Sequence, residues 1–144
     1  MTVPRLPRAL YESATLLASA ARAVTTGANG DEVRLPVAPA YGFVLNLTAA
    51  ATDAEDTLDA YVQTLVNGVW VDVVHFTQML GNGGAKRYFA KVSAGLAEAM
   101  FENGSSLAAG AVRHLCGDAW RVRWVIVDAD ADGLFTFSVS AVPM

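Results

Sequence analysis

Apolar and polar residues alternate along several short stretches of the chain. Between residues 41 and 49, the apolar side chains Phe43, Leu45 and Leu47 occupy every second position. Residues 86–93 alternate in the same way. Successive side chains of a β-strand point to opposite faces, so a period of two predicts strands with one buried face.

Two β-rich stretches, residues 61–66 and 69–76, are separated only by Asn67-Gly68. Asn-Gly readily adopts the positive φ angles of a type I′ turn, so a tight hairpin is expected here. The second stretch is apolar on both faces, which predicts that it lies between two layers or against a partner subunit. Strict alternation gives it one face with Trp70, Asp72, Val74 and Phe76, and another with Val69, Val71, Val73 and His75.

Two further alternating stretches, residues 120–127 and 134–142, are joined by the acidic segment 128–133. We expect them to form a second hairpin whose apolar faces point to the core. The first of them has an apolar face made of Trp120, Val122, Trp124 and Ile126, and the last stretch has one made of Phe135, Phe137 and Val139. Arg121 and Arg123 fall on the opposite face, which predicts a solvated surface or an interface.

The remaining stretches have weaker patterns. Residues 10–24 fit a strand or a helix, and residues 94–107 fit a short helix or a strand followed by a turn. Shorter pieces are expected as a turn at 25–30, a strand at 31–36, a glycine-rich loop at 80–85 and an irregular connection with a helical turn at 107–117.

About seven or eight short strands without strand–helix–strand alternation predict an all-β fold. We expect a two-sheet antiparallel β-sandwich of the jelly-roll kind with an extended N-terminal arm. Residues 1–24 would form the arm and the first strand region, and residues 25–144 the sandwich. The length of 144 residues and the hydrophobic share of 53% are enough for one such core.

Charge and cysteine content exclude several classes of protein. The net charge of −4 lacks the basic excess of a protein that grips nucleic acid through its phosphates. No apolar run reaches the roughly 18 residues of a membrane-spanning helix. Cys116 is the only cysteine, so neither an internal disulfide nor a cysteine-based zinc site is available.

The first residues combine prolines and arginines, Pro4, Arg5, Pro7 and Arg8. Proline restricts φ and lacks an N–H donor, so this piece is expected to be an extended arm that contacts a neighbouring subunit. A signal peptide is the alternative, but the prolines and Glu12 interrupt its apolar region. We therefore interpret residues 1–23 as an arm.

The segment Asp128-Ala-Asp130-Ala-Asp132-Gly133 matches the first half of a calcium-binding loop. The twelfth position of such a loop supplies a bidentate glutamate, and here it is Val139. The segment is therefore not an EF-hand. A looser calcium site and a solvated acidic turn remain as alternatives, and we favour the turn.

No catalytic motif is visible. His114, Cys116 and Asp118 lie close in sequence, but this spacing alone does not make a nucleophile with its base. We expect no enzymatic activity and no cofactor, and we interpret Cys116 as a small buried apolar residue.

Aromatic residues could form a sugar-binding platform, and the candidates are Tyr61, Trp70, Tyr88, Trp120 and Trp124. Alternation of Trp120 and Trp124 with apolar residues is more typical of a core.

Four segments resemble small virion structural proteins of tailed bacteriophages. They are the hairpin end WVDVVHFTQ at 70–78, GAKRY at 84–88, GDAWRVRW at 117–124 and FTFSVSA at 135–141. The opening stretch 10–25 is also similar. The acidic segment 128–133 departs from the neutral turn expected of such proteins.

This resemblance implies a capsid decoration protein on the virion surface, made in the cytoplasm of the bacterial host. Its expected partners are the major capsid protein and further copies of itself in a homotrimer, with no direct contact to nucleic acid or membrane. The alternative is a β-sandwich of the tail, neck or fibre that binds carbohydrate or a host surface. No catalytic residues follow from the resemblance.

Overall fold

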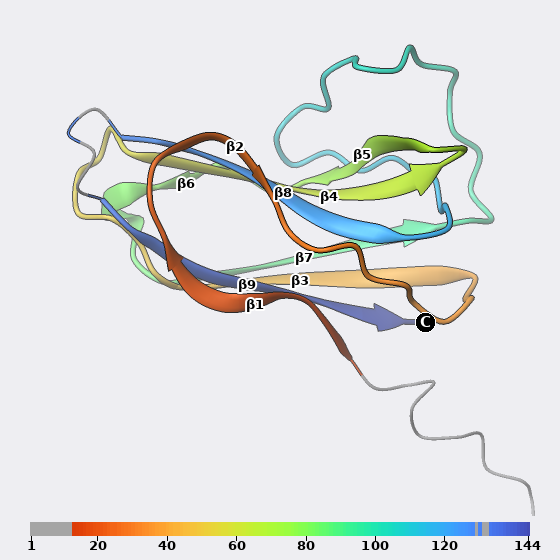
Figure 1. Ribbon diagram of the computed structural model, residues 1–144, viewed down its shortest axis with the longest axis horizontal. Coiled ribbons are helices and arrows are strands. Elements are labelled where there is room, and N and C mark those ends of the chain that lie inside the picture. The colour runs from red at the N-terminus through yellow and green to blue at the C-terminus, as the bar shows by residue number, and fades with distance from the viewer. Residues whose placement is uncertain (1–12, 129, 131–132) are drawn as a thin grey trace, which may run out of the picture.

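The computed structural model describes residues 13–128, 130 and 133–144 (Figure 1). The predicted arm residues Pro4, Arg5, Pro7 and Arg8 lie outside the described residues, as does Asp132 of the acidic segment. Within the described part of the chain, no helix is long and apolar enough to span a membrane.

The chain forms two antiparallel sheets that pack face to face, which confirms the predicted β-sandwich. One sheet has the strand order β1-β9-β3-β7 and the other has the order β2-β8-β4-β5. The strands are β1 (Ala14–Arg22), β2 (Thr25–Asn29), β3 (Ala40–Ala49), β4 (Thr57–Val66), β5 (Val69–His75), β6 (Met79–Leu80), β7 (Lys86–Ser93), β8 (Trp120–Val127) and β9 (Phe135–Pro143). The short β6 pairs with β4.

The pairing of the strands is that of a jelly roll. Strand β1 pairs with β9, β2 with β8, β3 with β7 and β4 with β5, as in a long antiparallel ribbon folded at its middle. Rolling this ribbon up adds the pairs β3 with β9 and β4 with β8, which complete the two sheets. The stretch 10–24 thus supplies the edge strand β1 of the sandwich.

The core lies between the two sheets and uses the alternating residues found in the sequence. Phe43 and Leu45 of β3 are fully buried, as are Phe135, Phe137 and Val139 of β9. The opposite sheet contributes the inward residues of β8, namely Trp120, Val122 and Ile126, all buried, and Trp124, packed against them at the edge of the core.

The predicted hairpin of β4 and β5 is confirmed. Asn67 and Gly68 have φ angles of 48° and 77°, as a type I′ turn requires. Strict alternation along β5 is wrong, however, because a β-bulge falls between the pairs Val62–Val74 and Gln63–Asp72. The extra residue, Val73, turns the strand there.

The bulge changes which side chains share a face. Val73 and Val74 are both buried, although they are neighbours in sequence. His75 lies opposite Tyr61, and Asp72 lies opposite Gln63, so His75 joins Asp72 on the outer face of the sheet.

The predicted second hairpin is wrong. Strands β8 and β9 belong to different sheets, and the acidic segment 128–133 crosses from one sheet to the other. A hairpin loop within one sheet and a loop that joins the two sheets have similar lengths. The sequence pattern of two successive strands therefore does not show which of these loops connects them.

Three weaker predictions also change. The expected turn at 25–30 is largely strand β2, which pairs with β8. The expected strand at 31–36 makes only one bridge, between Val33 and Trp120. Residues 94–119 are irregular, without the helix or helical turn considered for them, and the described residues hold only a short 3-10 helix at Gly81–Gly83.

Candidate functional site

The long connection between β7 and β8 covers part of one outer face. Its backbone binds the edge of β5, where Gly110 donates to the His75 carbonyl at 2.7 Å and Arg113 donates to the Val73 carbonyl at 2.8 Å. His75 in turn donates its N–H to the Ala111 carbonyl. The connection therefore closes this edge and folds back above the sheet (Figure 1).

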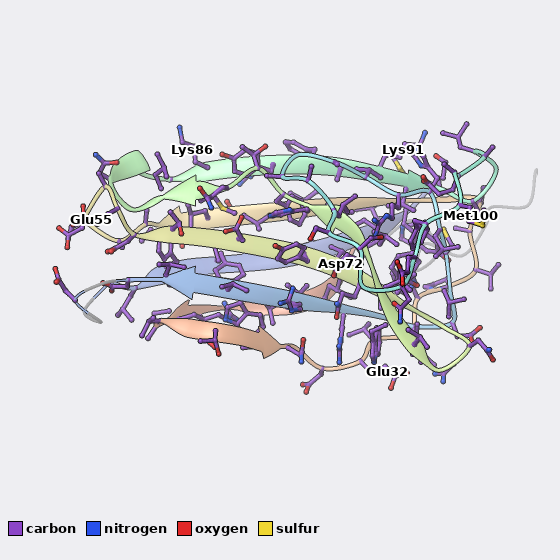
Figure 2. All side chains as sticks on the ribbon, turned by 90° about the horizontal axis from the view of Figure 1, so that it is seen from above. Glu32, Glu55, Asp72, Lys86, Lys91 and Met100 are labelled. Carbon is purple, nitrogen blue, oxygen red and sulfur yellow. The ribbon has the colours of Figure 1, made fainter. Side chains whose placement is uncertain are left out.

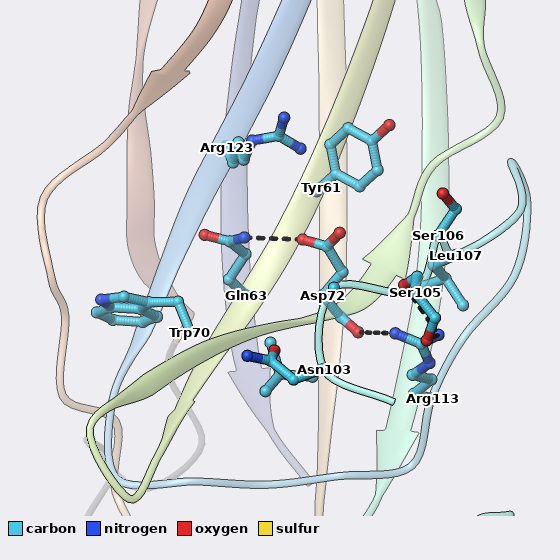
Figure 3. A pocket seen from close by; sticks show the side chains of 12 residues that line it. Tyr61, Gln63, Trp70, Asp72, Asn103, Ser105, Ser106, Leu107, Arg113 and Arg123 are labelled. Atoms are coloured by element: carbon cyan, nitrogen blue, oxygen red, sulfur yellow. Dashed lines mark hydrogen bonds between the residues drawn. The ribbon is translucent and has the colours of Figure 1, made fainter. Parts of the chain in front are cut away.

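A pocket of about 380 Å³ lies between this connection and the sheet. Figure 3 shows its floor, formed by side chains of β4, β5 and β8, and its wall, formed by residues of the connection. The floor includes Tyr61, Gln63, Trp70, Asp72 and Arg123, and the wall includes Asn103, Ser105, Ser106, Leu107 and Arg113. Polar and aromatic groups from three strands thus meet one irregular segment.

Hydrogen bonds across the strands hold the floor in place. Arg121 of β8 donates from Nε to the Gln63 side-chain oxygen at 2.7 Å. Gln63 donates from its amide nitrogen to Asp72 of β5 at 2.8 Å. Because the three residues stand side by side on adjacent strands, the sheet itself fixes this chain of donors and acceptors.

Three arginines around the pocket lie over aromatic rings. The guanidinium carbon is 4.3 Å from the ring centre for Arg121 over Trp70 and 5.1 Å for Arg123 over Tyr61. Arg113 lies over Phe101 at 4.1 Å. Burial, and next the nearby charge of Arg123, lower the pKa of Arg121, but a guanidinium stays charged at neutral pH.

The imidazole ring of His75 packs against the ring of Tyr61. The two rings stack with centres 4.1 Å apart. His75 is held at both ring nitrogens, by the Leu107 carbonyl at 2.7 Å and by Asp59 at 2.8 Å. Burial raises the pKa of the Tyr61 phenol, and the Asp59 carboxylate adds to this rise.

The structure does not assemble the five-residue aromatic platform considered from the sequence. Trp120 lies in the core, 1% exposed, and Tyr88 and Trp124 pack against the core. Tyr61 and Trp70 alone reach the pocket. The interpretation of Trp120 and Trp124 as core residues is confirmed.

Sequence reasoning missed the polar residues of the pocket, above all Gln63, Asp72 and Arg113. Cross-strand pairing in the recognised hairpin could have placed Gln63 near Asp72, but only with knowledge of the bulge. No sequence pattern indicated the position of Arg113, because this residue belongs to the irregular connection.

The side chains of His114 and Cys116 have separate surroundings. His114 accepts a hydrogen bond at Nδ1 from the backbone of Ser93 at 3.1 Å. Cys116 packs against the core, and burial raises the pKa of its thiol, which favours the unreactive protonated form. The hydrogen bonds of the described residues include none between the two side chains. The absence of catalysis itself stays a prediction.

Asp128, the first residue of the acidic segment, has a structural role. Asp128 is buried and accepts hydrogen bonds from the backbone N–H groups of Asp130 and Gly133. Among the described residues, no three histidine, cysteine or acidic side chains are grouped to hold a metal. Since Asp132 lies outside those residues, the calcium site on Asp128, Asp130 and Asp132 stays a prediction.

A second carboxyl group, which sequence reasoning missed, faces Asp128. Asp56, 1% exposed, comes from the connection before β4. A Cβ at Gly133 would lie 2.6 Å from an oxygen of Asp56 and 2.7 Å from one of Asp128, so the two carboxyl groups converge on this glycine. Burial, and then the facing charge of Asp128, raise the pKa of Asp56 to about 6.

Replacing Asp56 with asparagine is expected to reduce the pH dependence of stability. The pKa of Asp56 is higher in the folded chain than the ordinary aspartate value of 3.8, so the stabilising effect of its protonation is complete below that value and is lost as pH rises through about 6. Melting temperatures between about pH 4 and about pH 8 measure this. Relative to the unmodified protein, Asp56→Asn should gain thermal stability as pH rises.

The control for this experiment is Asp31→Asn, at an exposed carboxyl group of the loop after β2. It should keep the pH profile of the unmodified protein. Identical profiles for Asp56→Asn and the unmodified protein would contradict a raised pKa at Asp56.

Comparison with known proteins gives no further guidance to this site. No model of a protein family matches the chain, and no curated protein matches it.

Proposed function

We propose that the protein is a structural virion protein of a tailed phage or phage-like particle, specifically a decoration protein that binds the capsid lattice. The proposal assigns it no enzymatic activity. Its main support is the outer face of the β1-β9-β3-β7 sheet, which no described connection crosses (Figure 1). This face carries an apolar groove of about 400 Å³.

The groove exposes large apolar side chains to solvent. Phe89 of β7 is 74% exposed at its rim, and the C-terminal Met144 is 59% exposed. Gly42, Val44 and Val142 also line the groove. Contiguous exposed apolar surface of this kind is typical of sites that bind another protein.

The charges beside the groove indicate what kind of partner fits. The outward neighbours of Phe89 on β7 are Arg87 and Lys91, both basic, and a third basic residue, Lys86, begins the strand; Figure 2 shows Lys86 and Lys91 near the two ends of this edge. A matching protein surface would combine an apolar centre with acidic residues around it. We propose that the major capsid protein presents this surface.

Self-association is part of the same proposal. A homotrimer would bind the lattice at three points, which raises the overall affinity through effective concentration. The basic residues also protect the β7 edge from open-ended pairing with other strands. Light scattering on the isolated protein separates a trimer from a monomer.

Replacing Phe89 with serine is expected to weaken binding to capsids that lack the protein by roughly tenfold or more, because the side chain would lose its buried apolar contact. Co-sedimentation with purified capsids measures this. The melting temperature should change little, since Phe89 is exposed in the isolated chain.

The matched control is Val37→Ser. Val37 is fully exposed and lies outside the groove, so its replacement should leave capsid binding unchanged. Equal binding by the Phe89 and Val37 variants would rule out the groove as the contact. No binding by the unmodified protein, together with its absence from intact particles by mass spectrometry, would refute the capsid proposal.

A second candidate function is the binding of a carbohydrate or a host surface, on the tail, the neck or a fibre. The pocket under the connection favours it, because Asp72, Asn103 and Arg123 offer hydrogen-bonding groups of the kind that fix sugar hydroxyls. The two candidates use opposite faces of the sandwich and are compatible.

A further inference from the structure

The pocket between the sheet and the 94–119 connection is positively charged, although the chain as a whole has a net charge of −4. Two arginines, Arg113 and Arg123, line it, against one carboxylate, Asp72. In Figure 3 the two arginines stand on opposite sides of Asp72. A pocket with this balance favours a ligand with a negative charge.

The guanidinium groups near the pocket make no close ion pair with a carboxylate. Among the described residues, no carboxylate oxygen lies within 4.0 Å of a guanidinium nitrogen of Arg113, Arg121 or Arg123. Each instead lies over an aromatic ring. Arg113 donates to the Asp72 carbonyl and to Ser105, and Arg121 donates from Nε to Gln63, so only neutral acceptors take their hydrogen bonds. A guanidinium has five N–H donors, and those not used in this way can bind an anionic oxygen.

The aromatic floor is poorly suited to ordinary sugar stacking. Tyr61 has His75 against its ring at 4.1 Å, and Arg123 also lies over the ring. Trp70 has Arg121 over its ring. Charge and hydrogen bonding, more than contact with an aromatic face, must therefore provide recognition.

The neutral polar groups distinguish a charged sugar from an acidic peptide. The wall contains Asn103, Ser105 and Ser106, whose side chains can both donate hydrogen bonds to hydroxyl groups and accept them. Asp72 can accept from a hydroxyl, whereas it would repel a second carboxylate placed beside the first. A ligand with one carboxylate and several hydroxyls satisfies all of these groups, and a run of acidic amino acids does not.

We propose that this pocket binds a carboxylate-bearing sugar unit of an acidic polysaccharide. The carboxylate lies against Arg123 or Arg113, and the ring hydroxyls bind Asp72 and the wall. The proposal rests on the second candidate function and names its ligand class. It is independent of the capsid contact, which uses the opposite face.

The experiment compares three probes by titration calorimetry: a trisaccharide of galacturonate, the matching neutral trisaccharide of galactose, and poly-glutamate. Binding of the galacturonate probe alone, weakened by added salt, supports the proposal. Equal binding of the neutral probe would overturn it, because recognition would then not depend on the carboxylate of the sugar. Equal binding of poly-glutamate would overturn it in favour of an acidic protein partner.

Variants then test the residues. Arg123→Gln and, separately, Arg113→Gln should each weaken binding of the galacturonate probe roughly tenfold or more, the loss expected for one charge-assisted contact. Arg34→Gln is the control, because Arg34 is exposed outside the pocket and pairs with Glu32. Melting curves confirm that each variant is folded.

The outcomes separate this inference from the functions it accompanies. If no probe binds, or if folded variants of both arginines bind as well as the control, the acidic-sugar proposal fails. Capsid binding measured on the same samples is unaffected by that failure. Binding of the neutral trisaccharide alone would retain carbohydrate recognition and refute only the acidic ligand.

Discussion

Replacing Trp120 with alanine is expected to lower the free energy of unfolding by about 4 kcal/mol, the range found for removing a large aromatic side chain from a core. Trp120 is 1% exposed. Its ring packs against Tyr41 and Phe43, with ring centres 4.9 Å and 5.2 Å away. These partners belong to the opposite sheet, so the cavity would open between the two layers. Urea denaturation measures the loss.

Trp70→Ala is the matched control. Trp70 is half-buried on the outer face of the same sheet and packs against Arg121. Its loss should cost about 1 kcal/mol, the size of an exposed cation–π contact with some apolar burial. Similar losses for both variants would contradict the assignment of Trp120 to the centre of the core.

Replacing Gly117 with alanine is expected to lower the free energy of unfolding by about 3 kcal/mol or more, because the new methyl group overpacks a close backbone contact. A Cβ at this position would lie 2.0 Å from the Leu65 carbonyl oxygen. That oxygen accepts a hydrogen bond from Asp118, and Gly117 donates to the buried Thr64 hydroxyl. The methyl group would break contacts that attach the end of the connection to β4.

Gly95→Ala is the control for this variant, since a Cβ at Gly95 would meet nothing within 4 Å. Neither Gly95 nor Gly117 has a positive φ, so the comparison isolates the clash. Urea denaturation should find Gly95→Ala close to the unmodified protein. Equal stability of the two variants would show that the connection is not fixed at Gly117.

The two proposed surfaces lie on opposite sides of the sandwich. The apolar groove belongs to the outer face of the β1-β9-β3-β7 sheet, and the arginine-lined pocket to the outer face of the other sheet. A decoration protein bound to a capsid through the groove would therefore present the pocket outward. This arrangement unites the two candidate functions without requiring either surface to change shape.

The sequence alone determined the all-β class, most strand positions and the β4–β5 hairpin. These features depend on local chemistry: a period of two places alternate side chains on one face, and Asn67-Gly68 supplies the turn. The buried faces of β3, β8 and β9 followed from the same pattern.

Only the tertiary structure decided which strands are neighbours. Strands β8 and β9 follow one another yet enter different sheets, because a jelly roll pairs strands that are distant along the chain. The bulge at Val73 and the strand nature of residues 25–29 likewise depend on partners across the sheet.

The candidate sites required this long-range information most. Arg113 reaches the pocket only because the irregular connection binds the edge of β5, and Asp56 meets Asp128 only because two separate connections converge on Gly133. No local pattern encodes such meetings, since they arise from the packing of segments that are far apart in the sequence.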